Sequence, residues 1–171
     1  ADSEAEARQP TKRLVLSGPA GGHPRCRKIH SFINGGEDRH VRRCADLVTV
    51  DVEGLRVSLF VCCDLRFADE FWQLAPRTDV YLVPANWPAS RRDHWISLLR
   101  ARAIENQAYV IGCNRVGEGG GLDYSGDSLI VDPFGEVLAQ GLDTESVLYA
   151  EVTAERVAEV RDRFRFLPDR R

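Results

Sequence analysis

The chain has 171 residues, of which 43% are hydrophobic and 29% are charged. This length suits one domain with a substantial core, and the composition excludes a largely disordered chain. The formal net charge of −3 gives no reason to expect nucleic acid or an anionic membrane as a partner, and no apolar stretch is long enough to span a membrane.

Cysteine and lysine usage adds two constraints. The five cysteines are odd in number, two are adjacent and none forms a CxxC pair, which argues against a disulfide framework and favours a reducing cytoplasm. Cys26 and His30 are four residues apart and could hold a metal on a helix, but no second ligand pair follows, so we expect no metal site. The only lysines are Lys12 and Lys28.

The first half of the chain is predicted to form hairpins after a polar lead-in at residues 1–12. Apolar alternation and turn signals place strands at 13–17 and 25–28 around a glycine-rich turn. A second pair of strands is predicted at 47–52 and 55–62 around the tight turn Glu53-Gly54.

The second half alternates helices and strands. Helices are predicted at 68–75 and 91–106, and a last one, capped by Thr153, runs to about Phe164. Strands are predicted at 80–84, 108–113, 128–131, 136–139 and 147–152. Residues 117–121 are expected to be a glycine-rich loop, too irregular for a phosphate-binding fingerprint. This mixture predicts a layered α/β or α+β domain.

The segment Val61-Cys62-Cys63-Asp64 follows a predicted strand and precedes a predicted helix. A thiol at such a strand end can face a pocket and meet a backbone N–H of the turn, as a nucleophile requires. The alternatives are two ordinary buried thiols, or a redox switch between the adjacent cysteines, which the strain of a vicinal disulfide disfavours.

Lys28, Glu37 and Cys62 together could form a nucleophilic site. An ammonium near a thiol lowers the pKa of that thiol and can hold an oxyanion, and a carboxylate keeps the ammonium charged and oriented. As residue types alone these three are a weak signal, because solvated lysines and glutamates are common.

The order and local sequence of these residues resemble the nitrilase, or carbon–nitrogen hydrolase, superfamily, and most closely its bacterial ω-amidase-like branch. The matching blocks are Arg27–His30, Gly36-Glu37, Cys62–Phe67, Pro84–Pro88, Arg100–Tyr109, Asn114–Gly117 and Tyr124–Ser128.

The resemblance implies an α+β fold, the four-layer αββα sandwich, and hydrolysis of the C–N bond of a small amide through a cysteine thioester. It makes Cys62 the nucleophile and Lys28 the oxyanion-holding cation, and it has Glu37 support the lysine. The N–H of Cys63 is expected to meet the oxyanion. Asn86 and Trp87 follow a predicted strand end and are expected at the substrate, although Asn86 could equally cap the turn and Trp87 could be a packing anchor. No cofactor is implied, and the protein is expected to be a homo-oligomer.

Three departures from the family pattern affect these expectations. Cys63 and Cys26 replace family tyrosines next to the nucleophile and near the lysine. The family's general-base glutamate lies in a region before anything that resembles Arg13 onward. We therefore expect residues 13–171 to be an N-terminally incomplete hydrolase domain with impaired activity and poor solubility unless it oligomerises. The alternative is a non-catalytic truncated homologue that acts as a binding or assembly partner.

Other motif residues have structural interpretations. Trp95 is expected to be a packing anchor, and His30 and His94 to be hydrogen-bonded framework residues. Glu105 is expected to pair with Arg100 or Arg102. Asp64 and Arg66 are expected to form a buried ion pair that braces the turn.

Overall fold

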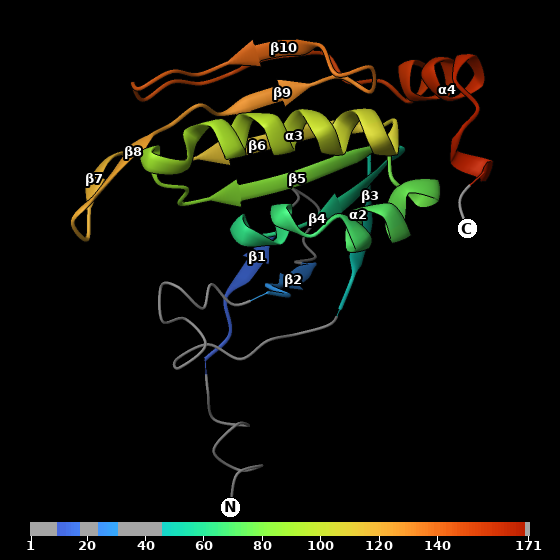
Figure 1. Cartoon of the computed structure of the whole chain (residues 1–171). Coiled ribbons are helices and arrows are strands. Elements are labelled where there is room, and N and C mark those ends of the chain that lie inside the picture. The colour runs from blue at the N-terminus through green and yellow to red at the C-terminus, as the bar shows by residue number, and fades with distance from the viewer. Residues whose placement is uncertain (1–9, 18–23, 31–45, 170–171) are drawn as a thin grey trace, which may run out of the picture.

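The computed structural model describes residues 10–17, 24–30 and 46–169, and its centre is a six-stranded mixed sheet (Figure 1). The strand order is β10-β9-β6-β5-β4-β3, in which β4, β5 and β6 are parallel and the other neighbours are antiparallel. The strands are β3 (Val48–Val52), β4 (Leu55–Leu59), β5 (Val80–Ala85), β6 (Tyr109–Asn114), β9 (Leu129–Val131) and β10 (Val137–Gln140). The predicted α+β class is confirmed.

Alternation along β4 divides the core between the two faces of the sheet. Val57 and Leu59 belong to one apolar cluster, whereas Phe60, directly after the strand, belongs to the other. The turn before β4 places Glu53 and Gly54 at φ 52° and 85°, the left-handed pair that a two-residue hairpin requires. The predicted tight turn is therefore confirmed.

Two helices cover the first face: α2 (Ala68–Leu74) and α3 (Arg92–Asn106) (Figure 1). The rings of Phe60 and Phe71 stack with their centroids 3.8 Å apart, and Trp95, on the buried side of α3, is fully buried. The role of Trp95 as a packing anchor is thus confirmed. Within the described residues, no helix is both long and apolar enough to cross a membrane.

The second face is covered in part by the hairpin of β1 (Arg13–Val15) and β2 (Arg25–Arg27). The Cys26 thiol donates to the carbonyl of Leu59 at 3.1 Å, which fastens β2 to the sheet. Because Cys26 lies on a strand, it does not share a helix with His30. In the described parts of the chain, no group of three or more potential metal ligands occurs.

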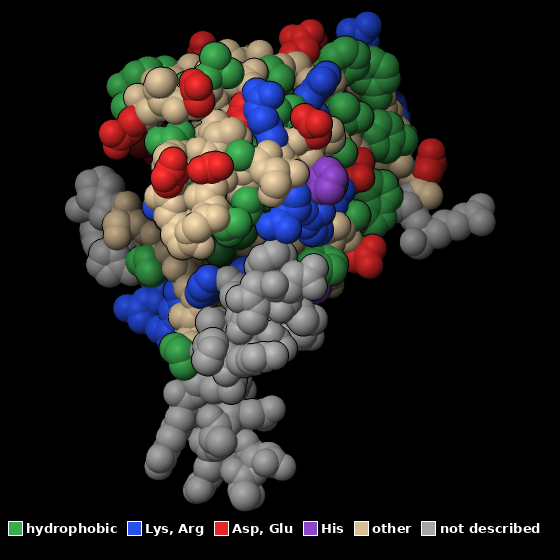
Figure 2. All heavy atoms as spheres, turned by 60° about the vertical axis from the view of Figure 1, so that its left-hand side comes forward, with side chains coloured by type: hydrophobic (Ala, Val, Ile, Leu, Met, Phe, Trp, Pro, Cys, Tyr) green, Lys and Arg blue, Asp and Glu red, His purple; other side chains and the backbone are tan. Residues whose placement is uncertain are grey.

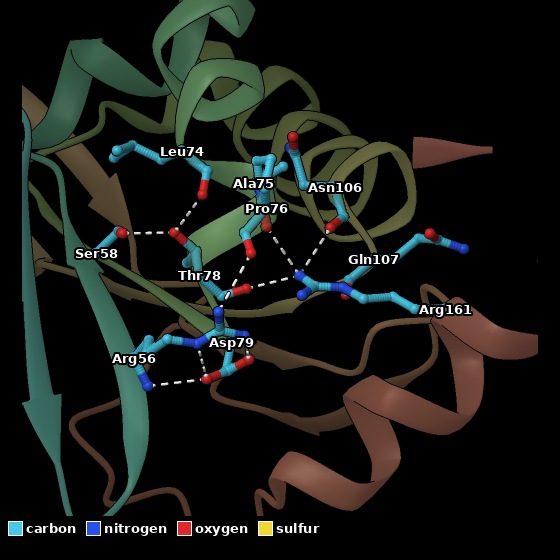
Figure 3. Close-up of polar contacts among 10 residues, drawn as sticks. All are labelled: Arg56, Ser58, Leu74, Ala75, Pro76, Thr78, Asp79, Asn106, Gln107 and Arg161. Atoms are coloured by element: carbon cyan, nitrogen blue, oxygen red, sulfur yellow. Dashed lines mark hydrogen bonds and ion pairs between the residues drawn. The ribbon is translucent and has the colours of Figure 1, made fainter. Parts of the chain in front are cut away.

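Helix α4 (Ala154–Arg163) lies near the end of the described chain, and Thr153 caps it by accepting a hydrogen bond from the N–H of Arg156 at 3.2 Å. Val157 of α4 joins the second apolar cluster. Arg161 attaches the helix to the sheet, since its guanidinium donates to the carbonyls of Thr78 at 2.6 Å, Ala75 at 3.0 Å and Gln107 at 3.1 Å (Figure 3).

Two predicted elements are wrong. Residues 117–121 are not a loop: β7 (Val116–Gly119) and β8 (Leu122–Ser125) pair as a hairpin, with Gly120 and Gly121 at φ 62° and 74°. Residues 147–152 form no strand, and Val147 and Tyr149 are 75% and 84% exposed. Their apolar alternation was misleading because no described strand lies beside them to supply ladder hydrogen bonds.

Short 3₁₀ helices join several elements. They are η3 (Cys62–Arg66), η4 (Ala75–Arg77), η5 (Ala89–Arg91) and η6 (Leu167–Asp169). Of these, η3 and η5 begin shortly after the carboxyl ends of β4 and β5. Chain segments that leave parallel strands at this edge commonly form binding sites.

Candidate active site

Cys62 stands at a sharp turn between β4 and η3. Its φ of 52° lies in the left-handed region, which costs a non-glycine residue free energy of the order of 1–3 kcal/mol. Strain of this kind persists only where the surrounding structure imposes it, and it is common at functional positions. The turn leaves Cys62 half-buried, whereas Cys63 is buried.

The Cys62 thiol faces a pocket at the carboxyl edge of the parallel strands. This pocket has a volume of about 480 Å³, and its lining includes Lys28, Val61, Cys62 and Asn86. Asn86 directly follows β5, and its carbonyl oxygen lies 3.9 Å from Cys62 Sγ. The structure therefore brings Cys62, Lys28 and Asn86 to one cavity.

Lys28 reaches this cavity because it directly follows β2. Its N–H donates to the carbonyl of Lys12 at 3.0 Å, which continues the β1–β2 hairpin, and the residue is only 3% exposed. A buried ammonium needs a partner of opposite charge or good hydrogen-bond acceptors. The ammonium of Lys28 lies near the thiol of Cys63, since its charge acts on the pKa of that thiol.

The two adjacent thiols have different environments. Burial raises the pKa of Cys63 to about 11, although the charge of Lys28 acts in the opposite direction. The Cys63 thiol also donates to the carbonyl of His30 at 2.8 Å. Cys63 therefore remains a protonated structural thiol at neutral pH, while Cys62 is the one that faces the cavity; both are free of disulfides.

A second cavity, of about 320 Å³, adjoins the first and shares Lys12, Cys62 and Asn86 with it. Its other lining residues are Cys63, Arg66, Trp87, Pro88, Arg91, Leu122 and Tyr124. The guanidinium of Arg66 lies 4.5 Å from the centre of the Trp87 ring. Burial, and after it the nearby charge of Arg91, lower the pKa of Arg66.

Basic side chains are thus concentrated beside the thiol. Figure 2 shows Lys and Arg side chains gathered next to a histidine, just above the grey atoms. No aspartate or glutamate among the described residues lines either cavity. Such a site favours an anionic group.

The predicted ion pair between Asp64 and Arg66 is wrong. Asp64 accepts instead from three backbone N–H groups, and Arg66 contacts Trp87 and, at 3.4 Å, Nδ1 of His94. The carboxylate points to the segment after β2 and the guanidinium to the cavity.

Two other structural predictions are confirmed. His30 Nε2 lies 2.6 Å from Glu70, which with the His94 contact makes both histidines hydrogen-bonded framework residues. Arg102 pairs with Glu105 at 2.8 Å. Glu37, the predicted support of Lys28, lies outside the described residues.

Sequence reasoning missed Arg66, Arg91 and Tyr124 as cavity residues. Arg66 lies inside the Cys62–Phe67 block, and Tyr124 inside another matching block, so the resemblance could have indicated both. Arg91 had no such signal, because it reaches the cavity only through the 3₁₀ turn η5.

A cysteine and a lysine at one cavity are what the resemblance implies, and the family model for carbon-nitrogen hydrolases matches residues 8–162. The chain belongs to the carbon–nitrogen hydrolase family. The predicted resemblance is therefore confirmed.

Curated relatives of this carbon–nitrogen hydrolase include amidases. An omega-amidase (YafV) of Yersinia enterocolitica is 43% identical over 155 residues, which cover 89% of this chain and 60% of the relative. A 2-oxoglutaramate amidase of Bacillus subtilis is 37% identical over 137 residues, which cover 80% of this chain and 53% of the relative. The chain thus spans between half and two thirds of the length of these relatives.

Solved structures give the same family and fold. The crystal structure of a CN-hydrolase superfamily protein from Xanthomonas campestris, with an arsenic adduct in its active site, matches with a TM-score of 0.89 and 34% identity. That match covers 94% of this chain and 64% of the neighbour. The predicted nitrilase-like αββα class is confirmed by this neighbour.

Proposed function

We propose that this carbon–nitrogen hydrolase cleaves the C–N bond of a small amide, with Cys62 as nucleophile. The observation that carries the proposal is the shared cavity of Cys62 and Lys28 at the carboxyl edge of three parallel strands. The thiolate of Cys62 attacks the amide carbon, and the resulting oxyanion is held by the Lys28 ammonium and the N–H of Cys63. Ammonia leaves, and water then hydrolyses the thioester to a carboxylate.

The proton of Cys62 must pass to a general base. The described lining of the two cavities supplies no carboxylate for this step, and we propose that a glutamate from outside this lining accepts the proton. We assign Glu37 the role of supporting Lys28, as the resemblance implies. Loss of a general base typically lowers a rate by roughly a hundred- to ten-thousand-fold, which is the impairment expected without that glutamate.

The substrate class follows from the second cavity and from the relatives. Amidases acting on 2-oxoglutaramate are among the relatives, and the cavity beside Cys62 carries Lys12, Arg66 and Arg91. An amide with a carboxylate at its far end would place that carboxylate among these cations, with Asn86 and Trp87 at its sides. We propose such an ω-amide as the substrate.

Ammonia release from 2-oxoglutaramate, compared with release from pentanamide, tests this function. We expect preference for the anionic amide, no release by Cys62→Ala, and a trapped acyl-enzyme on Cys62 in acid-quenched wild-type protein by mass spectrometry. Absence of both the adduct and ammonia, with retained binding to another protein, would support the non-catalytic alternative instead.

Two further properties belong to this proposal. The described cysteines are free thiols, which supports a reducing, cytoplasmic location. Exposed apolar side chains at Leu142, Val147 and Tyr149 support a homo-oligomer, because such surface is costly in water. Light scattering coupled to size-exclusion chromatography tests this, and a monodisperse monomer at high concentration would contradict it.

A further inference from the structure

Asp64 has an unusual set of partners for a buried carboxylate. It is 1% exposed, and within the described residues its side chain accepts from three backbone groups: Oδ1 from His30 N at 2.8 Å, and Oδ2 from Val61 N at 3.0 Å and Ile29 N at 3.4 Å. Two of these N–H groups directly follow Lys28, and the third directly precedes Cys62. One side chain therefore joins the two segments that carry the cation and the thiol.

We propose that Asp64 is a positioning residue that holds Lys28 in reach of Cys62. The inference rests on the proposed function, in which these two residues act on one carbonyl. Asp64 does not line either cavity, so its influence on the reaction passes through the backbone of residues 28–30 and 61–62.

Neighbouring contacts bind the same two segments together. The Cys63 thiol donates to the His30 carbonyl at 2.8 Å, and the His30 ring stacks on Phe67 with the centroids 3.6 Å apart. His30 Nε2 also meets Glu70 at 2.6 Å. These contacts hold His30 in place. The Asp64 carboxylate, in contrast, accepts hydrogen bonds from backbone N–H groups next to Lys28 and next to Cys62.

A carboxylate suits this position for a chemical reason. Three N–H donors converge on its two oxygens, and an ionised carboxylate has acceptor sites for all of them. An asparagine offers one acceptor oxygen, and its NH₂ group would face an N–H donor. Asp64→Asn therefore breaks at least one of the bonds that tie Lys28 to the Cys62 turn, with little change in side-chain volume.

Asp79 provides a matched control. It is 4% exposed and accepts three hydrogen bonds from Arg56, from N at 2.9 Å, Nε at 2.8 Å and Nη2 at 2.6 Å (Figure 3). It lies at the opposite end of the parallel strands from Cys62, just before β5. Asp79→Asn should thus weaken the fold without disturbing the site.

The test measures the pH dependence of iodoacetamide alkylation at Cys62 by mass spectrometry, alongside urea unfolding. We expect both variants to lose stability, but only Asp64→Asn to move the alkylation midpoint upward by about one pH unit, which slows alkylation below the midpoint about tenfold. Asp64→Glu, which keeps the charge, should give a smaller shift and serves if Asp64→Asn does not fold. An unchanged midpoint in a folded Asp64 variant overturns the proposal.

Lys28→Met separates this proposal from the proposed function. If that variant leaves the alkylation midpoint of Cys62 unchanged, Lys28 does not act on the thiol and the positioning role of Asp64 is wrong, whereas the proposed function still stands or falls on ammonia release. If Lys28→Met raises the midpoint while folded Asp64 variants do not, only the positioning role of Asp64 is wrong.

Discussion

The side-chain amide of Asn114 pairs with the backbone of Trp87 on both sides. Its Oδ1 accepts from the N–H of Trp87 at 2.7 Å, and its Nδ2 donates to the carbonyl of the same residue at 3.1 Å and to that of Gly126 at 2.7 Å. Asn114, at the end of β6, thereby fixes the segment after β5 that forms a wall of both cavities.

Asn114→Asp should loosen this wall. The carboxylate cannot donate, and it would place a negative oxygen opposite two carbonyl oxygens, so we expect a loss of about 1–3 kcal/mol in unfolding free energy and a raised KM for the amide. Urea unfolding and steady-state kinetics measure the two effects. Ser146→Ala, in a pocket that Asn114 also lines but Trp87 does not, is a suitable control, and an unchanged KM in Asn114→Asp would contradict the role of this wall in binding.

Alkaline pH should destabilise the protein through Cys63. Its pKa is raised from 9.0 to about 11 by burial, so between these values the unfolded chain releases the proton while the folded chain keeps it. Stability is then complete below about pH 9 and falls as the pH rises toward 11, by at most about 2.7 kcal/mol. Urea unfolding from pH 8 to 11 should show this slope in the wild type.

Cys63→Ala should flatten that slope, although it also removes the hydrogen bond to His30 and lowers stability at pH 8. Cys113→Ala, which removes an exposed thiol, should leave the slope as in the wild type. Equal slopes in wild type and Cys63→Ala would show that this thiol does not carry the alkaline transition.

Thiol labelling should rank the cysteines by access. At pH 8 we expect iodoacetamide to modify Cys62 and Cys113 and to spare Cys26 and Cys63, because the last two are buried and Cys63 remains protonated. Peptide mass spectrometry over a time course reads each site separately. Labelling of Cys63 before Cys62 in folded protein would reverse the assignment of the nucleophile.

Arg161→Ala should detach α4 from the sheet. The guanidinium donates hydrogen bonds to backbone carbonyls at the ends of η4 and α3, and its removal leaves those carbonyls without these donors (Figure 3). We expect a loss of about 2–4 kcal/mol, since hydrogen bonds to a charged group are individually stronger than neutral ones. Arg165→Ala removes a solvent-exposed pairing with Asp162 and should change stability little. Thermal unfolding of the two variants and the wild type measures both effects.

Local sequence patterns predicted the elements whose partners are near in sequence. The sequence predicts the β3–β4 turn because Glu53-Gly54 can adopt two left-handed conformations in succession. It predicts the Thr153 cap because the hydroxyl of this residue accepts from an N–H only three residues later. The same rule applies to Gly120-Gly121, a glycine pair that closes the β7–β8 hairpin although the irregular run of glycines predicts a loop.

Predictions were wrong where the partner of a residue or segment depends on parts of the chain that are distant in sequence. Asp64 could pair with Arg66 nearby, yet it binds N–H groups that only the fold brings to it. Residues 147–152 alternate like a strand, but alternation does not reveal whether another strand lies alongside. The juxtaposition of Lys28 and Cys62 came from the resemblance to the family, because no local rule relates the end of β2 to the end of β4.

The β7–β8 hairpin bonds in its own two-stranded sheet and supplies Leu122 and Tyr124 to the cavity beside the thiol. Residues added or removed at its Gly120-Gly121 tip would alter the entrance while leaving the six-stranded scaffold and the Cys62 turn in place. If the proposed amidase function holds, changes in this ribbon should alter the preference for one amide over another while the six-stranded sheet keeps its own hydrogen bonds.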